Sequence, residues 1–128
     1  MSKTNLFGVF LKEKRQETNL SLRELARSIG VAHTYILNIE NGSKAPPGDV
    51  ILKKIANALH FDAQTAELFY DLAAMCKQND DGKNLYLPTD VFEYIQKTES
   101  AKSAIRQANK LGYGNEFWIE VLKQLENK

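Results

Sequence analysis

The stretch HTYILNIEN carries an unusual set of side chains for the exposed surface of a helix. Wound at about 100° per residue, it places five side chains on one side: His33, Thr34, Leu37, Asn38 and Asn41. A face that meets only water is usually rich in Lys and Glu, and this one has neither. Asn, Thr and an apolar side chain together suit the recognition of base edges in the major groove of DNA. The alternative is a polar surface that binds nothing.

This face has to be positioned by its own buried side and by the helix before it. Ile36 and Ile39 fall opposite the polar side chains and predict inward packing. Upstream, Ser21 and Glu24 have the spacing of a capping box that begins a helix, and Gly30 is a typical residue just after a helix end. Two short helices joined by so tight a turn indicate a helix-turn-helix.

The apolar residues elsewhere also recur at helical rather than alternating spacing, so the whole chain is expected to be helical. A first helix is predicted over about 5–18. After the prolines of SKAPPG, a fourth helix is predicted over 49–59. Its expected inward stripe is Val50, Ile51, Ile55, Ala56 and Leu59. Asp62 is expected to cap a fifth helix that buries the thiol of Cys76.

The stretch KQNDDGKN is polar and contains glycine, which is typical of a linker. It predicts a helix-turn-helix domain over residues 1–76, a linker over 77–84 and a C-terminal helical segment over 85–128. The segment contains three short helical patterns, two of them with Ser100 and Asn115 as expected caps.

The segment LSLRELARSIGVAHTYILNIENG resembles the helix-turn-helix of lambda-type phage repressors, Cro and the Xre-family regulators. The matching residues are Ser21, Leu25, Ala26, Gly30, Val31, Ile36, Ile39, Glu40 and Gly42. The resemblance continues through KKIANALHFD and covers about residues 5–75. It implies an all-α chain in which a five-helix, lambda-repressor-like DNA-binding domain precedes a small C-terminal helical segment.

The resemblance also implies roles for individual positions. The base-contacting positions are His33, Thr34, Leu37 and Asn38. Asn41 and Lys44 match positions near the phosphate backbone, and Arg23 is the substitute phosphate contact for Leu22, where the family often has Gln. Arg15 and Glu40 match a structural ion pair between the first and third helices. Two further departures are Ala32, which replaces the usual capping Ser or Thr, and His60, which replaces a glycine.

The charge is unevenly distributed although the formal net charge is only +1. Residues 1–60 contain nine Lys or Arg and five Asp or Glu, a balance of +4. Residues 61–128 contain eight and eleven, a balance of −3. The first half is therefore the part suited to a polyanion such as double-stranded DNA.

Other classes of function find little support in the sequence. The spacing of His33, His60 and Cys76 is not that of metal ligands. The sequence also has neither a phosphate-binding glycine loop nor the pattern of a catalytic triad. We therefore expect that the protein is not an enzyme and has no catalytic residue, metal or cofactor. No apolar run reaches the length of a membrane span. Charges interrupt the apolar residues of the first segment, unlike a signal peptide. We therefore expect a cytoplasmic protein without a membrane partner.

The C-terminal segment is rich in apolar residues that so short a unit seldom buries alone. They include Phe92, Tyr94, Ile95, Ala104, Ile105, Ala108, Leu111, Phe117, Trp118, Val121, Leu122 and Leu125. We expect the segment to form a homodimer, and the alternatives are a sensor or protein-binding module and a cap on the same chain. The expected function is a sequence-specific repressor that binds an inverted-repeat operator as a dimer. The alternative is an antitoxin or protein inhibitor whose helix-turn-helix serves autoregulation.

Overall fold

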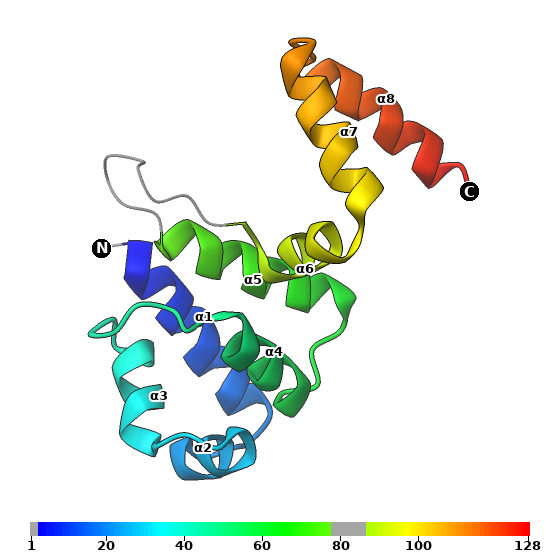
Figure 1. Ribbon diagram of the computed structural model, residues 1–128. Helices are drawn as coiled ribbons and strands as arrows, with labels where there is room; N and C mark the ends of the chain where they lie inside the picture. The colour runs from blue at the N-terminus through cyan, green and yellow to red at the C-terminus, as the bar shows by residue number, and fades with distance from the viewer. Residues whose placement is uncertain (1–2, 78–86) are drawn as a thin grey trace. The chain divides into compact units, whose positions relative to one another are not determined.

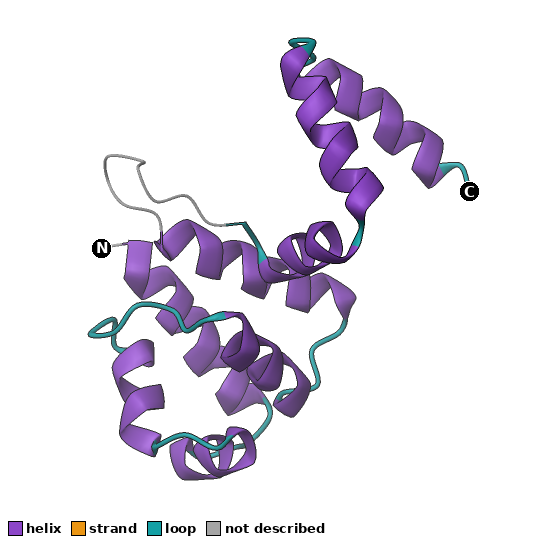
Figure 2. Cartoon of the chain, in the orientation of Figure 1, coloured by secondary structure: helices purple, strands orange, loops and turns teal. Residues whose placement is uncertain are grey.

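A computed structural model describes residues 3–77 and 87–128, with the side chains of its first helix described from Leu6 onward. Figures 1 and 2 show that all regular structure within these residues is helical. The helices are α1 (Lys3–Glu17), α2 (Leu22–Ile29), α3 (His33–Glu40), α4 (Asp49–Ala58), α5 (Ala63–Lys77), α6 (Thr89–Lys97), α7 (Glu99–Lys110) and α8 (Asn115–Glu126). The expected all-α fold is confirmed. The chain divides into two compact units, Met1–Phe92 and Glu93–Lys128.

The core of the first unit forms where the apolar stripes of α1 to α5 meet. Fifteen buried residues make up this cluster: Phe7, Leu11, Leu25, Ala26, Ile29, Ile36, Ile39, Leu52, Ile55, Ala56, Leu59, Phe69, Tyr70, Ala73 and Cys76. Phe69 of α5 lies at its centre, with ring centroids 5.0 Å from Phe7 and 5.1 Å from Phe61. This packing holds α1 against α5 and leaves α2 and α3 on another side of α1 (Figure 1).

Local sequence signals predicted the helix ends in this unit well. The Ser21 hydroxyl accepts a hydrogen bond from Glu24 N at 3.0 Å, and the Glu24 carboxylate accepts one from Ser21 N at 2.9 Å. Gly30 ends α2 with φ 77°, and Asp62 caps α5 by accepting from Thr65 N at 2.8 Å. His60 adopts the left-handed conformation with φ 56°. This costs free energy in a residue other than glycine, Asn or Asp.

The expected inward stripe of α4 is wrong at its first position. Val50 is 69% exposed, whereas Leu52 is 1% exposed and belongs to the core. Leu52, Ile55 and Leu59 follow helical spacing and point to one side. Val50 precedes Leu52 by two residues, which places it on nearly the opposite side of the helix.

The first unit extends beyond the boundary expected at residue 76. Thr89 is buried, and its hydroxyl donates a hydrogen bond to the Asp49 carboxylate at 2.7 Å, which ties the beginning of α6 to the beginning of α4. Of the expected linker at 77–84, only Lys77 is among the described residues. The division of the chain into domains therefore stays a prediction.

The second unit contains α7 and α8, which are joined at a turn where Gly112 has φ 75°. The expected caps are each displaced, because the N-cap residues are Thr98 and Gly114 rather than Ser100 and Asn115, and neither makes a side-chain capping bond. Little of this unit is buried, and Ala108 is its single buried residue. None of the described helices is both long and apolar enough to cross a membrane.

Candidate nucleic-acid interface

The turn between α2 and α3 determines the direction in which α3 leaves the preceding helix. Gly30 takes a left-handed conformation that favours glycine, and Val31 N donates to the Ala26 carbonyl at 3.0 Å. The chain then enters α3 at His33 after the extended residue Ala32. Ala32 provides no side-chain hydrogen bond to the helix, which agrees with the cap expected to be missing at this position.

The inner side of α3 is tightly packed. Ile36 and Ile39 are 0% and 1% exposed, and both belong to the core cluster. On the outer side, Thr34 and Leu37 are exposed, and Asn38 is half-buried. The helix therefore presents the polar stripe away from the core, as a base-reading face requires. His33 is half-buried at the start of the helix, and the base contacts of these four residues stay predictions.

The expected phosphate-contacting side chains flank this stripe in the chain. Arg23 is exposed on α2, and Asn41 and Lys44 are exposed just after α3. The loop after α3 is ordered by local hydrogen bonds, because Asn41 Oδ1 accepts from Ser43 N at 2.9 Å and Lys44 N donates to the Asn38 carbonyl at 3.0 Å. This fixes the backbone at Lys44, and the residue itself is exposed. The phosphate contacts themselves stay predictions.

A buried ion pair joins α1 to the end of α3. Arg15 Nε donates to Glu40 Oε2 at 2.7 Å, and the Nη2 atom of Arg15 donates to Glu40 Oε1 at 3.0 Å. A third bond runs from Arg15 Nη1 to the Leu20 carbonyl at 2.8 Å. The hydrogen bond to Glu40 raises the pKa of the Arg15 guanidinium, so Arg15 stays charged although it is buried. Glu40 therefore faces Arg15 and is withdrawn from the outer surface of α3.

Gly8 also positions α3, although the sequence does not single it out for this role. A Cβ at this position would lie 2.5 Å from the carbonyl oxygens of both Ile39 and Glu40. The sequence signal for this role was a glycine in the middle of an amphipathic helix. Such a glycine destabilises the helix by about 1 kcal/mol relative to alanine, and it is often present because another element packs closely against it.

Two further observations concern side chains outside the interface. Cys76 is buried, as predicted. Within residues 3–77 and 87–128, no three His, Cys, Asp or Glu side chains gather as a metal site would require.

Comparison with known proteins supports the assignment of this motif. The Helix-turn-helix family model HTH_3 matches residues 11–64. A Bacillus phage phi105 protein, the ImmF control region 10 kDa protein, is 33% identical over 61 residues, which are 48% of this chain and 67% of the phage protein.

Longer relatives match over segments of similar length. An HTH-type transcriptional regulator of Mycobacterium tuberculosis is 37% identical over 57 residues, and the transcriptional repressor RghR of Bacillus subtilis is 40% identical over 53 residues. These segments are 44% and 41% of this chain, and they span only 40% and 39% of the two relatives. A chain of a solved SinR protein/SinI protein complex aligns over 94% of both chains at 22% identity, with a TM-score of 0.44.

The helix-turn-helix geometry, the matched residues 11–64 and the phage relative agree with one another. The chain belongs to the Xre-type helix-turn-helix family.

Proposed function

We propose that this protein is a sequence-specific DNA-binding transcriptional repressor that acts as a homodimer on an inverted-repeat operator. The observation that carries the proposal is the outer side of α3, where exposed Thr34 and Leu37 stand beside Asn38 on a helix whose opposite side is fully packed. The names of the bacterial relatives, two regulators of which one is a repressor, support the same class of function.

The recognition step follows from the chemistry of α3. Asn38 has the amide that forms paired hydrogen bonds with adenine, and Leu37 offers an apolar contact for a thymine methyl group. Thr34 can bond either a donor or an acceptor on a base edge. Arg23 and Lys44 would contact phosphates and fix the register of α3 in the groove.

Dimerisation is supported by the surface of the second unit. Its exposed large apolar side chains are Tyr94, Ile105, Leu111, Tyr113, Phe117, Trp118, Ile119, Leu122 and Leu125. Apolar side chains exposed in such number on a small unit mark an interaction surface. A second copy is the favoured occupant, because one recognition helix reads only a few base pairs and two-fold operators match two-fold dimers.

In the alternative function, this surface binds a different protein instead of a second copy of the chain. An antitoxin or protein inhibitor would use the same apolar residues to bind an unrelated protein, and its helix-turn-helix would regulate its own gene. The two functions differ in the state of the pure protein. In the repressor the C-terminal segment is folded and dimeric by itself, whereas in the antitoxin it is unstable alone and folds on its partner.

Selection of bound duplexes from a random DNA pool tests the main proposal. An enriched inverted repeat is the expected result, and a pool without any enriched sequence would overturn sequence-specific binding. The mass of the full chain in solution tests the dimer. Leu122→Lys should convert a dimer to a monomer, whereas Gln124→Lys on the same helix adds the same charge and should leave it dimeric. A wild-type monomer would contradict the dimer proposal and favour the alternative.

A further inference from the structure

An open hollow of about 240 Å³ lies where α2 meets the turn before α3. It is lined by Arg23, Ala26, Arg27, Val31, Ala32 and His33. Two of these side chains are guanidinium groups, and none is acidic. The hollow is smaller than pockets that enclose drug-sized molecules, so its size suits a single small anionic group.

The two arginines are neighbours on one face of α2. They are four residues apart, a spacing that brings side chains together on a helix, and both are exposed. Among the described residues, no carboxylate lies within ion-pair distance of either guanidinium. Glu24 is an acidic group that interacts electrostatically with Arg27. Its pKa is lowered first by hydrogen bonds with Ser21 and only then by the charge of Arg27.

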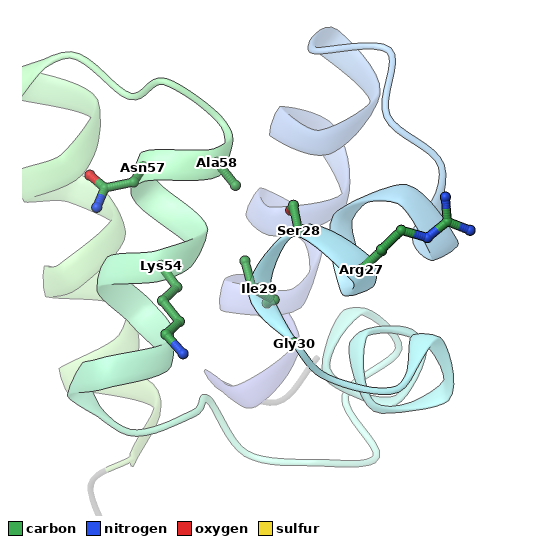
Figure 3. Close-up of a pocket in the computed structure, with 7 residues that line it drawn as sticks. All are labelled: Arg27, Ser28, Ile29, Gly30, Lys54, Asn57 and Ala58. Carbon is green, nitrogen blue, oxygen red and sulfur yellow. The ribbon is translucent and has the colours of Figure 1, made fainter.

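A second, larger groove of about 610 Å³ lies between α2 and α4, and Arg27 also contributes to its lining (Figure 3). Figure 3 shows the Arg27 side chain directed away from Lys54 and Asn57, which line the α4 side of this groove. Arg27 also lines the smaller hollow together with Arg23, and its guanidinium is turned away from the α4 side of the larger groove. Lys54 is an exposed cation that is separate from the smaller hollow.

The identity of the anion follows from His33, which lines the hollow and also begins the polar stripe of α3. An anion held here lies directly beside the surface that would face the bases. Guanidinium groups match the oxygen atoms of phosphate in a forked geometry. We propose that the hollow binds one phosphate of the DNA backbone and that Arg27 contacts it together with Arg23. This proposal rests on the proposed function and adds a contact that the family resemblance does not assign.

The test compares two full-length variants that each lose one positive charge. On a duplex selected from the random pool and on an unrelated duplex, Arg27→Gln should bind roughly tenfold more weakly than wild type at low salt. The slope of log affinity against log salt should fall by about 1. Lys54→Gln should bind both duplexes as the wild type does. Equal losses in the two variants, or no loss in Arg27→Gln, would overturn the proposal.

The phosphate that Arg27 contacts can be identified by replacing the backbone phosphates of the selected duplex, one at a time, with neutral methylphosphonates. One position should weaken wild-type binding about tenfold and weaken Arg27→Gln binding less, because that variant has already lost one of the two arginine contacts to this phosphate. If every substituted duplex weakens both proteins equally, Arg27 contacts no phosphate and the proposal is wrong. Such a result leaves the proposed function intact, since enrichment from the pool tests that separately. Equal melting temperatures for wild type and Arg27→Gln show that the fold is retained.

Discussion

Gly8 of α1 lies directly against Glu40 at the end of α3, so close that a Cβ on Gly8 would be 2.5 Å from the Glu40 carbonyl oxygen. The neighbouring atoms belong to the backbone and cannot rotate away. The two helices therefore meet through main-chain atoms at this point. The contact and the Arg15–Glu40 ion pair both fix the end of α3, from which the loop to Lys44 begins.

Gly8→Ala should destabilise the protein. Alanine favours a helix by about 1 kcal/mol over glycine, but the overlap with α3 should cost more, so we expect a net loss of about 1–3 kcal/mol. Chemical denaturation measures this free energy of unfolding. Gln16→Ala, at an exposed position of the same helix, controls for the effect of alanine in α1 and should not destabilise. An equally stable Gly8→Ala variant would show that α1 and α3 can separate without cost.

Glu40→Gln should lower the free energy of unfolding by about 3 kcal/mol, because it leaves the buried Arg15 charge without its carboxylate. Glu17→Gln is the matched control, since Glu17 pairs with Lys14 at 3.4 Å on the surface and such pairs contribute about 0–1 kcal/mol. Both variants are compared with wild type by thermal and urea unfolding. If the two substitutions have the same small effect, the buried pair does not stabilise the fold.

The features that the sequence predicted well are those governed by neighbouring residues. The Ser21–Glu24 capping box and the left-handed Gly30 depend on side chains and backbone within one turn, so their spacing was sufficient. Val50 is a different case, because helical spacing already groups Leu52 with Ile55 and Leu59 and places Val50 on nearly the opposite side of α4. The expected stripe was wrong there because it did not follow the helical period.

The close contact between Gly8 and the backbone of α3 depends on the position of α3 in the folded protein. A pattern of neighbouring residues in the sequence does not reveal that position. For the same reason, only one of the two arginines of α2 could be predicted from the sequence. The family resemblance supplied Arg23, whereas the hollow that Arg27 shares with it appears only when α2 and the following turn are placed together.

Asp62 should make stability depend on pH through its cap on α5. Its hydrogen bond from Thr65 N lowers the pKa of the carboxyl below its ordinary value. The charged cap therefore stabilises the fold above the unfolded-state pKa, and this contribution is lost as pH falls through the lowered folded-state pKa. Asp62→Asn keeps an oxygen acceptor but does not titrate. Its stability deficit relative to wild type should shrink as pH is lowered from 6 to about 3.

Unfolding curves at several pH values measure this deficit. Asp71→Asn, on the exposed side of α5, controls for the loss of one negative charge. A deficit of Asp62→Asn that stays constant over the whole range would mean that the Asp62 charge does not contribute to the cap.

Lys44→Ala should weaken binding to all duplexes by a similar factor, because phosphate contacts carry no sequence information. The salt slope should fall by about 1 as one phosphate contact is lost. Affinity measured at several salt concentrations gives both quantities, and the fold should be unaffected because the Lys44 side chain is exposed. An unchanged slope would remove Lys44 from the phosphate-contacting residues.

Asn38→Ala should instead reduce discrimination between sequences. Loss of a paired bond to a base costs about 1–3 kcal/mol on the selected site and little on unrelated DNA. The helix should persist, since alanine is a better helix former than Asn and the position is not part of the core. Thr34→Ala combined with Asn38→Ala should lower the ratio of specific to non-specific affinity further, measured on the two duplexes at one salt concentration. If the doubly substituted protein is folded and keeps the full ratio, α3 does not read bases through these residues, and its outer stripe is only a polar surface.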